Sequence, residues 1–392
     1  MNPRRTGLNQ SERALSSIAD KTFLRLWSYA NVHVGKPRKD RIEPKKVADL
    51  LVICGMDVII FSDKNIEWPT SGDVNIDWCR WFRRSIKSSG EQLRKAERIL
   101  TNFPDSLYID DKCKIRMPID IPDLTKARVH GVLVASGAED ACRKFFNGGT
   151  GTLFISSLLK EEEHYTPGHR NYSPFLVGDV NTKGAFLHVF DFNALDLVMS
   201  ELNTITDFCD YLTSREELLR SDRTVLAVGE EDLLACFLQT KTPDGKHDFL
   251  NDENPALRES EIAIIPEGCW LDYTRRPEYK AKKREEVNSY FWDWLIEKFT
   301  HHLLEGTAPV IRNVKPTTRS AEHALRVMAR EPRVSRRALA QALTEGMQRA
   351  SVRKAVRFCR YVFSSINENS AQLVYIFLIL AYDESFAKCH GL

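Results

Sequence analysis

Four polar residues in the first hundred positions have the types and the order that metal-assisted hydrolysis of a phosphodiester requires. They are Glu12, Asp49, Lys64 and Gln92. Carboxylates can hold one or two Mg²⁺ ions, and a nearby cation can stabilise negative charge or orient the attacking water. Asp63, directly before the lysine, is a further acid in this set. The residue types therefore indicate a candidate hydrolytic site, provided that the fold brings them together.

The segment 49–64 is predicted to be a β-hairpin that places Asp49 beside Lys64. Two apolar runs rich in β-branched residues flank a Gly-Met-Asp turn at 55–57, as expected for two buried strands. In an antiparallel pair, the start of the first strand and the end of the second lie at the same end of the sheet. We therefore expect Asp49 to lie close to residues 62–64.

Helices are predicted before and after this hairpin. Residues 11–30 have apolar side chains at the three- and four-residue spacing of an amphipathic helix, with Ser11 as its N-cap. Residues 75–102 have a second apolar stripe, which is interrupted near 88–90. A basic loop with two prolines is expected over 31–46. The two helices would carry the glutamate and the glutamine of the candidate site.

This arrangement resembles the PD-(D/E)XK nuclease superfamily, particularly its restriction-endonuclease-like and nuclease-related branches, over about the first 100 residues. In that superfamily an αβββα core presents a helix glutamate, a strand aspartate and an acid-x-lysine motif, and a following helix often adds a glutamine. The resemblance implies that Glu12, Asp49 and an acid near Asp63 hold Mg²⁺ or Mn²⁺. It also implies that Lys64 stabilises charge or orients water, and that Gln92 positions substrate or solvent.

The acid-x-lysine position departs from the superfamily pattern. The motif places an acid two residues before the lysine on the same strand face, and Ser62 occupies that position here. Asp63 is adjacent, so its side chain alternates to the other face. A bulge or strand end could turn Asp63 inward, or Glu43 or Asp57 could supply the acid. Alternatively, the site binds nucleic acid without cutting it, or the fold is unrelated.

The rest of the chain is predicted to continue as α/β structure and to end in helices, which gives an α/β or α+β fold class. Strands are expected at 106–110, 114–117, 128–135, 152–156, 185–190 and 225–228. Helices are expected at 193–220, 231–238, 280–304, 320–330, 335–345, 350–364 and 371–383, with a long loop at 241–260. The expected organisation is a nuclease-like core over 1–140, a middle α/β region over 141–260 that is separate or continuous with it, and a helical, basic region over 261–392.

Positive charge is concentrated in two parts of a chain whose formal net charge is only +2. Residues 1–46 contain 11 Lys and Arg against 4 Asp and Glu, and residues 307–362 contain 13 against 3. Such segments favour a polyanion partner, because each Lys or Arg placed on a phosphate releases counterions. Solvated surface, or contact with the acidic remainder, is the alternative. The predicted nucleic-acid contacts are Arg83, Arg84, Arg336, Arg337 and Arg353.

Composition excludes several classes of protein. The nine cysteines include no Cys-x-x-Cys pair, which argues against a disulfide framework and a zinc ribbon and favours a reducing cytoplasm. The longest strongly apolar stretch, Leu373 to Tyr382, is too short to span a bilayer, and the first residues lack the apolar core of a secretory signal. We expect a cytoplasmic protein that cuts DNA or RNA, with bacterial defence or DNA maintenance suggested by the resemblance alone. A non-cutting nucleic-acid-binding protein or a scaffold is the alternative. The C-terminal helices are also candidates for homo-oligomer or protein-partner contacts.

Overall fold

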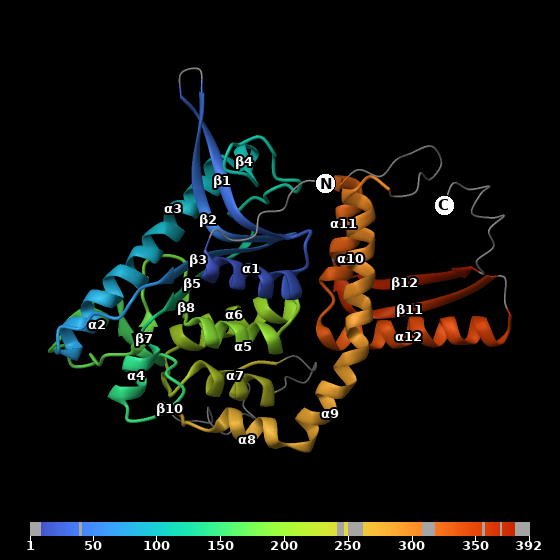
Figure 1. Cartoon of the computed structure of the whole chain (residues 1–392). Helices are drawn as coiled ribbons and strands as arrows, with labels where there is room; N and C mark the ends of the chain where they lie inside the picture. Colours follow the sequence, from blue (N-terminus) through green and yellow to red (C-terminus); the bar gives the residue numbers. More distant parts are fainter. Residues whose placement is uncertain are drawn as a thin grey trace.

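A six-stranded mixed sheet in the order β4-β1-β2-β3-β5-β8 organises the N-terminal half of the molecule (Figure 1). The computed structural model describes residues 9–38, 41–240, 247–249, 262–307, 318–354, 357–368 and 371–380. The sheet strands are β1 (Ser28–Arg38), β2 (Arg41–Cys54), β3 (Asp57–Asn65), β4 (Leu107–Tyr108), β5 (Arg128–Ser136) and β8 (Leu187–Phe190). β1, β2 and β3 are antiparallel neighbours, whereas β5 is parallel to β3 and β8 is parallel to β5. The mixed α/β class expected from the sequence is confirmed.

The predicted hairpin is present, and its first strand begins at Arg41, earlier than the sequence indicated. β2 and β3 meet at a turn in which Gly55 has a φ of 66°, and Cys54 pairs with Asp57. The predicted basic loop is instead the long antiparallel ribbon of β1 and β2. The first helix, α1 (Gln10–Phe23), ends where Leu24 takes a φ of 61°, so the helix predicted to continue to residue 30 is wrong. Asn9, and not Ser11, caps α1, because its side chain accepts a hydrogen bond from the Glu12 backbone.

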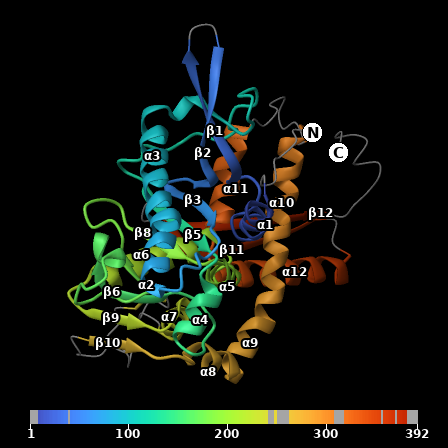
Figure 2. The same cartoon turned by 60° about the vertical axis from the view of Figure 1, so that its left-hand side comes forward.

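Two helices cover opposite faces of the sheet, and strand alternation assigns residues to them (Figure 2). On one face, Leu50 and Val52 of β2 share a core with α1, and on the other, Leu51 and Ile53 share a core with α3 (Ser88–Asn102). α3 follows α2 (Val74–Phe82) and a five-residue π-helical segment, 83–87. The long helix predicted over 75–102 is therefore confirmed, with its interruption slightly earlier than expected.

A second, four-stranded sheet in the order β10-β9-β6-β7 lies beyond the first. Its strands are β6 (Phe154–Lys160), β7 (Leu176–Asp179), β9 (Thr224–Ala227) and β10 (Ile262–Ile265). The helices of this part are α4 (Glu139–Phe145), α5 (Phe192–Glu201), α6 (Ile205–Arg220) and α7 (Glu230–Gln239), and short 3₁₀ turns cover Pro104–Ser106, Glu161–Tyr165 and Val287–Ser289. One core includes residues of both sheets and of α5 to α7, so the two sheets share their interior. Most of the loop predicted at 241–260 lies outside the described residues.

The C-terminal part contains helices followed by a β-hairpin. The helices are α8 (Cys269–Arg275), α9 (Pro277–Glu286), α10 (Tyr290–Leu304), α11 (Thr318–Ala329) and α12 (Arg333–Val352). β11 (Arg357–Glu368) and β12 (Ala371–Leu380) then form an antiparallel pair, so the helices predicted at 350–364 and 371–383 are wrong. Both segments are rich in aromatic and β-branched residues, which fit a strand better than a helix. No helix in the described ranges is long and apolar enough to cross a membrane.

Candidate functional site

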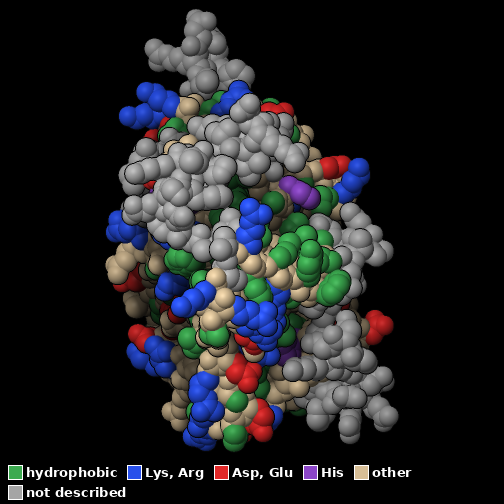
Figure 3. All heavy atoms as spheres, turned by 90° about the vertical axis from the view of Figure 1, so that its right-hand side faces the viewer, with side chains coloured by type: hydrophobic (Ala, Val, Ile, Leu, Met, Phe, Trp, Pro, Cys, Tyr) green, Lys and Arg blue, Asp and Glu red, His purple; other side chains and the backbone are tan. Residues whose placement is uncertain are grey.

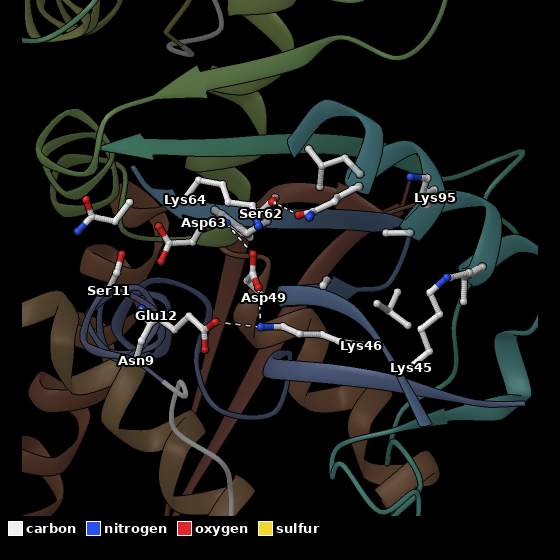
Figure 4. Close-up of a pocket in the computed structure, with 18 of the residues that line it drawn as sticks. Asn9, Ser11, Glu12, Lys45, Lys46, Asp49, Ser62, Asp63, Lys64 and Lys95 are labelled. Atoms are coloured by element: carbon white, nitrogen blue, oxygen red, sulfur yellow. Dashed lines mark hydrogen bonds and ion pairs between the residues drawn. The ribbon is translucent and has the colours of Figure 1, made fainter. Parts of the chain in front are cut away.

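A cleft of about 780 Å³ opens where β2 and β3 separate (Figure 4). The two strands pair as far as Leu50 opposite Phe61. Beyond this pair, β2 continues into the ribbon with β1, while β3 stays paired with β5 as far as Asn65. The first turn of α1 and the middle of α3 complete the walls. The fork between the strands therefore exposes polar side chains that an unbroken sheet would bury.

The carboxylates of Glu12 and Asp49 both hold the ammonium group of Lys46. Lys46 Nζ lies 2.9 Å from Glu12 Oε1 and 2.6 Å from Asp49 Oδ1. Only 9% of the Glu12 side chain and 14% of the Asp49 side chain are exposed, against 31% for Lys46. Burial disfavours the charged ammonium, but the two carboxylates outweigh this effect and raise the pKa of Lys46. The cleft therefore contains a partly buried triad of two acids and one base.

Asp63 joins the triad from the end of β3. Its backbone N–H donates to Asp49 Oδ2 at 2.7 Å, which ties the two diverging strands together. Its side chain extends toward Ser11 and Glu12 on the α1 side of the sheet (Figure 4). Burial raises the pKa of Asp63; the Ser11 hydrogen bond and Lys46 oppose the rise, and Asp49 and Glu12 add to it. Within the described part of the chain, the buried Oδ1 of Asp63 has no hydrogen-bond partner.

Ser62 faces the opposite side of the sheet from Asp63, as strand alternation predicts. Its hydroxyl donates to Gln92 Oε1 of α3 at 3.2 Å, and the residue is only 3% exposed. The acid-x-lysine position thus points at the glutamine, and Asp63 reaches the other acids from the α1 side. Of the two substitute acids considered, Asp57 lies at the far end of β3, where it pairs with Arg128 at 2.7 Å. Glu43 is exposed on β2 and does not line the cleft.

Three further lysines line the cleft: Lys45, Lys64 and Lys95. Lys64 is partly exposed at the end of β3, and no ion pair holds it among the residues that the structure describes. The five predicted site residues, Glu12, Asp49, Asp63, Lys64 and Gln92, therefore all border one cleft. Lys46 was not predicted. Its position three residues before Asp49 could have suggested an ion pair between the two. The segment was expected to be a loop, so this spacing was not used.

The predicted nucleic-acid contacts lie in different surroundings. Arg83 and Arg84 are exposed on the π-helical segment, and the Arg83 guanidinium lies 4.9 Å from the ring centroid of Tyr165. Arg353 is exposed at the end of α12, and Arg337 of α12 pairs with Glu285.

The prediction that Arg336 contacts nucleic acid is wrong, because the side chain is buried. It is only 1% exposed, and its guanidinium bonds to Asp293 at 2.6 Å and to the Glu331 carbonyl at 2.8 Å. A buried side chain with these partners joins α10 to α12 and does not reach a bound nucleic acid.

The acids of the cleft match a hard cation in donor type but not in their present arrangement. Mg²⁺ prefers oxygen ligands and binds through one or two carboxylates, with waters and substrate phosphates completing its shell. Glu12, Asp49 and Asp63 supply such oxygens, and the unpartnered Asp63 Oδ1 could accept a cation. The Lys46 ammonium, however, lies between Glu12 and Asp49, and the described residues contain no assembled group of three or more metal-ligating side chains. Metal binding here therefore requires that Lys46 move aside.

Comparison with known proteins gives no relative for this chain. No family model, curated protein or solved structure matches it. The function must therefore be argued from the cleft itself.

Proposed function

We propose that the cleft binds the phosphodiester backbone of DNA or RNA and hydrolyses it with Mg²⁺ or Mn²⁺. The observation that carries the proposal is the convergence of Glu12, Asp49, Asp63 and Lys64 in one cleft from separate segments of the chain. The order α1-β1-β2-β3-α3-β5, with helices on both faces, supports a restriction-endonuclease-like core. A role in bacterial defence or DNA maintenance rests on that resemblance alone.

The lysines at the cleft give the substrate its binding surface. Lys45 and Lys64 line the cleft on the two diverging strands, and Lys95 faces them from α3. Ammonium groups bind phosphate oxygens as point charges, so these three residues can bind the phosphates of a strand in the cleft. Lys64 lines the cleft at the end of the strand that also carries Asp63, and in this proposal it stabilises the negative charge that develops during hydrolysis.

The acids would hold the divalent cation once Lys46 has moved. Glu12, Asp49 and Asp63 are the ligands in this proposal, and a cation held there would polarise the scissile phosphate and favour an ionised water. Lys46 would then be free to contact a neighbouring phosphate. Gln92 is held by Ser62 on the opposite side of β3 and would orient substrate or solvent from there.

The test is cleavage of labelled single-stranded DNA, duplex DNA and RNA by the full chain, with Mg²⁺ or Mn²⁺ against EDTA. We expect metal-dependent cleavage that falls at least about a hundredfold in Asp49→Asn and Lys64→Met. Lys21→Met is the matched control, because Lys21 is an exposed lysine of α1 outside the cleft. Absence of cleavage of all three substrates with either metal would refute the nuclease proposal.

A second candidate function is nucleic-acid binding without cleavage. It is favoured by Lys46, which already forms ion pairs with both Glu12 and Asp49, and by Ser62 at the usual acid position. This function predicts binding that weakens with salt, that is reduced by Lys64→Met, and that is indifferent to EDTA. Absence of binding to any polyanion at low salt would instead favour a scaffold or adaptor.

A further inference from the structure

The β11–β12 hairpin has one apolar face that packs inside the molecule. Tyr375 and Phe377 of β12 contact the ring of Trp292 in α10, with centroids 5.1 and 6.1 Å apart. Arg360 of β11 donates to the Ala342 carbonyl of α12 at 2.7 Å. The hairpin is therefore fixed on its inner side by two helices.

The outer face of the same hairpin is also apolar, and no part of the chain that the structure describes buries it. Strand register places its residues in three directly opposed pairs, Cys359 with Leu378, Tyr361 with Ile376, and Phe363 with Val374. Their exposed fractions are 64% for Tyr361 and Phe363, 63% for Leu378, 62% for Ile376 and 44% for Val374, and Cys359 is exposed as well. These six residues are called the outer face below. Figure 3 shows a group of hydrophobic side chains on the side of the molecule that carries this hairpin.

The outer face is a large and continuous apolar patch. Its five apolar side chains with known exposure present roughly 600 Å² to solvent, which is at the upper end of the largest patch on a typical monomer. A polar outer face would be expected on a two-stranded ribbon whose other face is already buried, because alternation separates the two faces completely. Apolar residues on both faces are typical of a ribbon buried between two layers.

We propose that the outer face is the contact between two copies of this chain. Two identical faces packed about a two-fold axis are self-complementary by symmetry, since each residue of one copy can meet its counterpart or a cross-strand neighbour on the other. Burial of both faces would remove roughly 1,200 Å² from solvent, which reaches the lower limit of a specific interface. The six residues include no charged side chain, and Arg357, which alternation places at the end of the same face opposite Leu380, is exposed and would lie at the edge of the contact.

The first test is the oligomeric state of the full chain by sedimentation velocity from about 1 to about 100 μM. We expect a concentration-dependent dimer in the wild type and a dissociation constant at least about tenfold higher in Ile376→Lys, which places a charge at the centre of the face. Ile264→Lys is the matched control, because Ile264 is 59% exposed on β10 of the four-stranded sheet and lies outside the outer face. It should leave the dissociation constant unchanged.

The second test measures protection of the Cys359 thiol, which lies on the outer face. Modification by a maleimide, followed by peptide mapping to separate Cys359 from the other cysteines, should slow as protein concentration rises. A protein that is monomeric at about 100 μM overturns the proposal. In that case a reactive Cys359 would indicate an unoccupied face, and a Cys359 that is protected at every concentration would indicate that another part of the chain covers it. A dimer that is equally stable in Ile376→Lys also overturns it. Because the outer face contains none of the cleft residues, these outcomes do not depend on nuclease activity.

Discussion

Replacement of Lys46 by methionine should destabilise the protein by about 2 kcal/mol. The substitution keeps the apolar stem and removes the ammonium group that lies within 3 Å of both Glu12 and Asp49. Removal of one partner of a buried ion pair costs about 3–5 kcal/mol, whereas exposed pairs contribute about 0–1 kcal/mol. The acids are 9% and 14% exposed and the lysine 31%, so the expected loss lies between these limits.

The same variant reports on metal binding. If Glu12, Asp49 and Asp63 form a cation site when the ammonium group is absent, Mg²⁺ should stabilise Lys46→Met more than the wild type. At a Mg²⁺ concentration about 100 times its dissociation constant, linkage gives a gain of about 2.7 kcal/mol. Urea unfolding at neutral pH, with and without Mg²⁺ and at constant ionic strength, measures both effects.

Lys45→Met provides the control, because Lys45 is the exposed neighbour of Lys46 on the same strand. It should change the free energy of unfolding by less than about 0.5 kcal/mol. Equal stability of the two variants would show that the Lys46 ion pairs contribute little. An equal Mg²⁺ response in Lys46→Met and the wild type would refute the idea that the lysine and a cation compete for the same carboxylates.

Three further outcomes follow from two buried side chains and from a glycine with a positive φ. Burial raises the pKa of Asp191 to about 7, above its value in the unfolded chain, so the folded state holds an extra proton between these two values. The free energy of unfolding should therefore fall by up to about 4 kcal/mol as the pH rises from about 4 to 7. Urea unfolding at several pH values measures this slope, which should disappear in Asp191→Asn. Arg336→Met should lower the free energy of unfolding by about 3 kcal/mol because it leaves Asp293 with one cation fewer. Arg353→Met, at an exposed position, is the control, and an equally large loss in this variant would contradict the prediction. Gly137→Ala should lower the free energy of unfolding, measured by thermal unfolding, by at least about 2 kcal/mol, because φ is 107° and the new Cβ would lie 2.1 Å from the Ile66 carbonyl oxygen. Unchanged stability would show that the backbone relaxes easily at this position.

The hairpin and its convergent ends could be predicted because they follow from local patterns. The turn at 55–57 separates two apolar runs of the sequence, and antiparallel pairing then brings residue 49 near residues 62–64. The structure confirms this proximity through the 2.7 Å hydrogen bond from the Asp63 backbone to Asp49. The alternation that sends Ser62 and Asp63 to opposite faces was equally available from the sequence.

Lys46 could not be assigned in the same way, because its position depends on a long-range pairing. The segment before Asp49 contains Pro44 and several charged residues, which are typical of a loop. It is a strand here because it pairs with β1, for example Lys45 with Val34. The sequence gives no local measure of that pairing, so the lysine between the two acids was missed.

The C-terminal hairpin was missed because its second strand, β12, is apolar on both faces over 373–380. A continuous apolar run such as 373–380 is compatible with either a buried helix or a strand. Alternation becomes visible only in the structure, where Tyr375 and Phe377 face Trp292 while Ile376 and Leu378 face outward. Because both faces of β12 are apolar over 373–380, no charged residue marks the period of two in this strand.

The divergence of β2 and β3 makes the cleft sensitive to insertions and deletions. Because side chains alternate with a period of two, one residue added or removed between the turn and Ser62 would exchange the faces of the serine and the aspartate. After a deletion the aspartate would take the position of Ser62, where it would meet Gln92 and lose Glu12. Two residues would restore the original faces and shift the acid along the strand by one repeat, about 7 Å. The number of residues after the turn is therefore as decisive for this cleft as the identity of its acids.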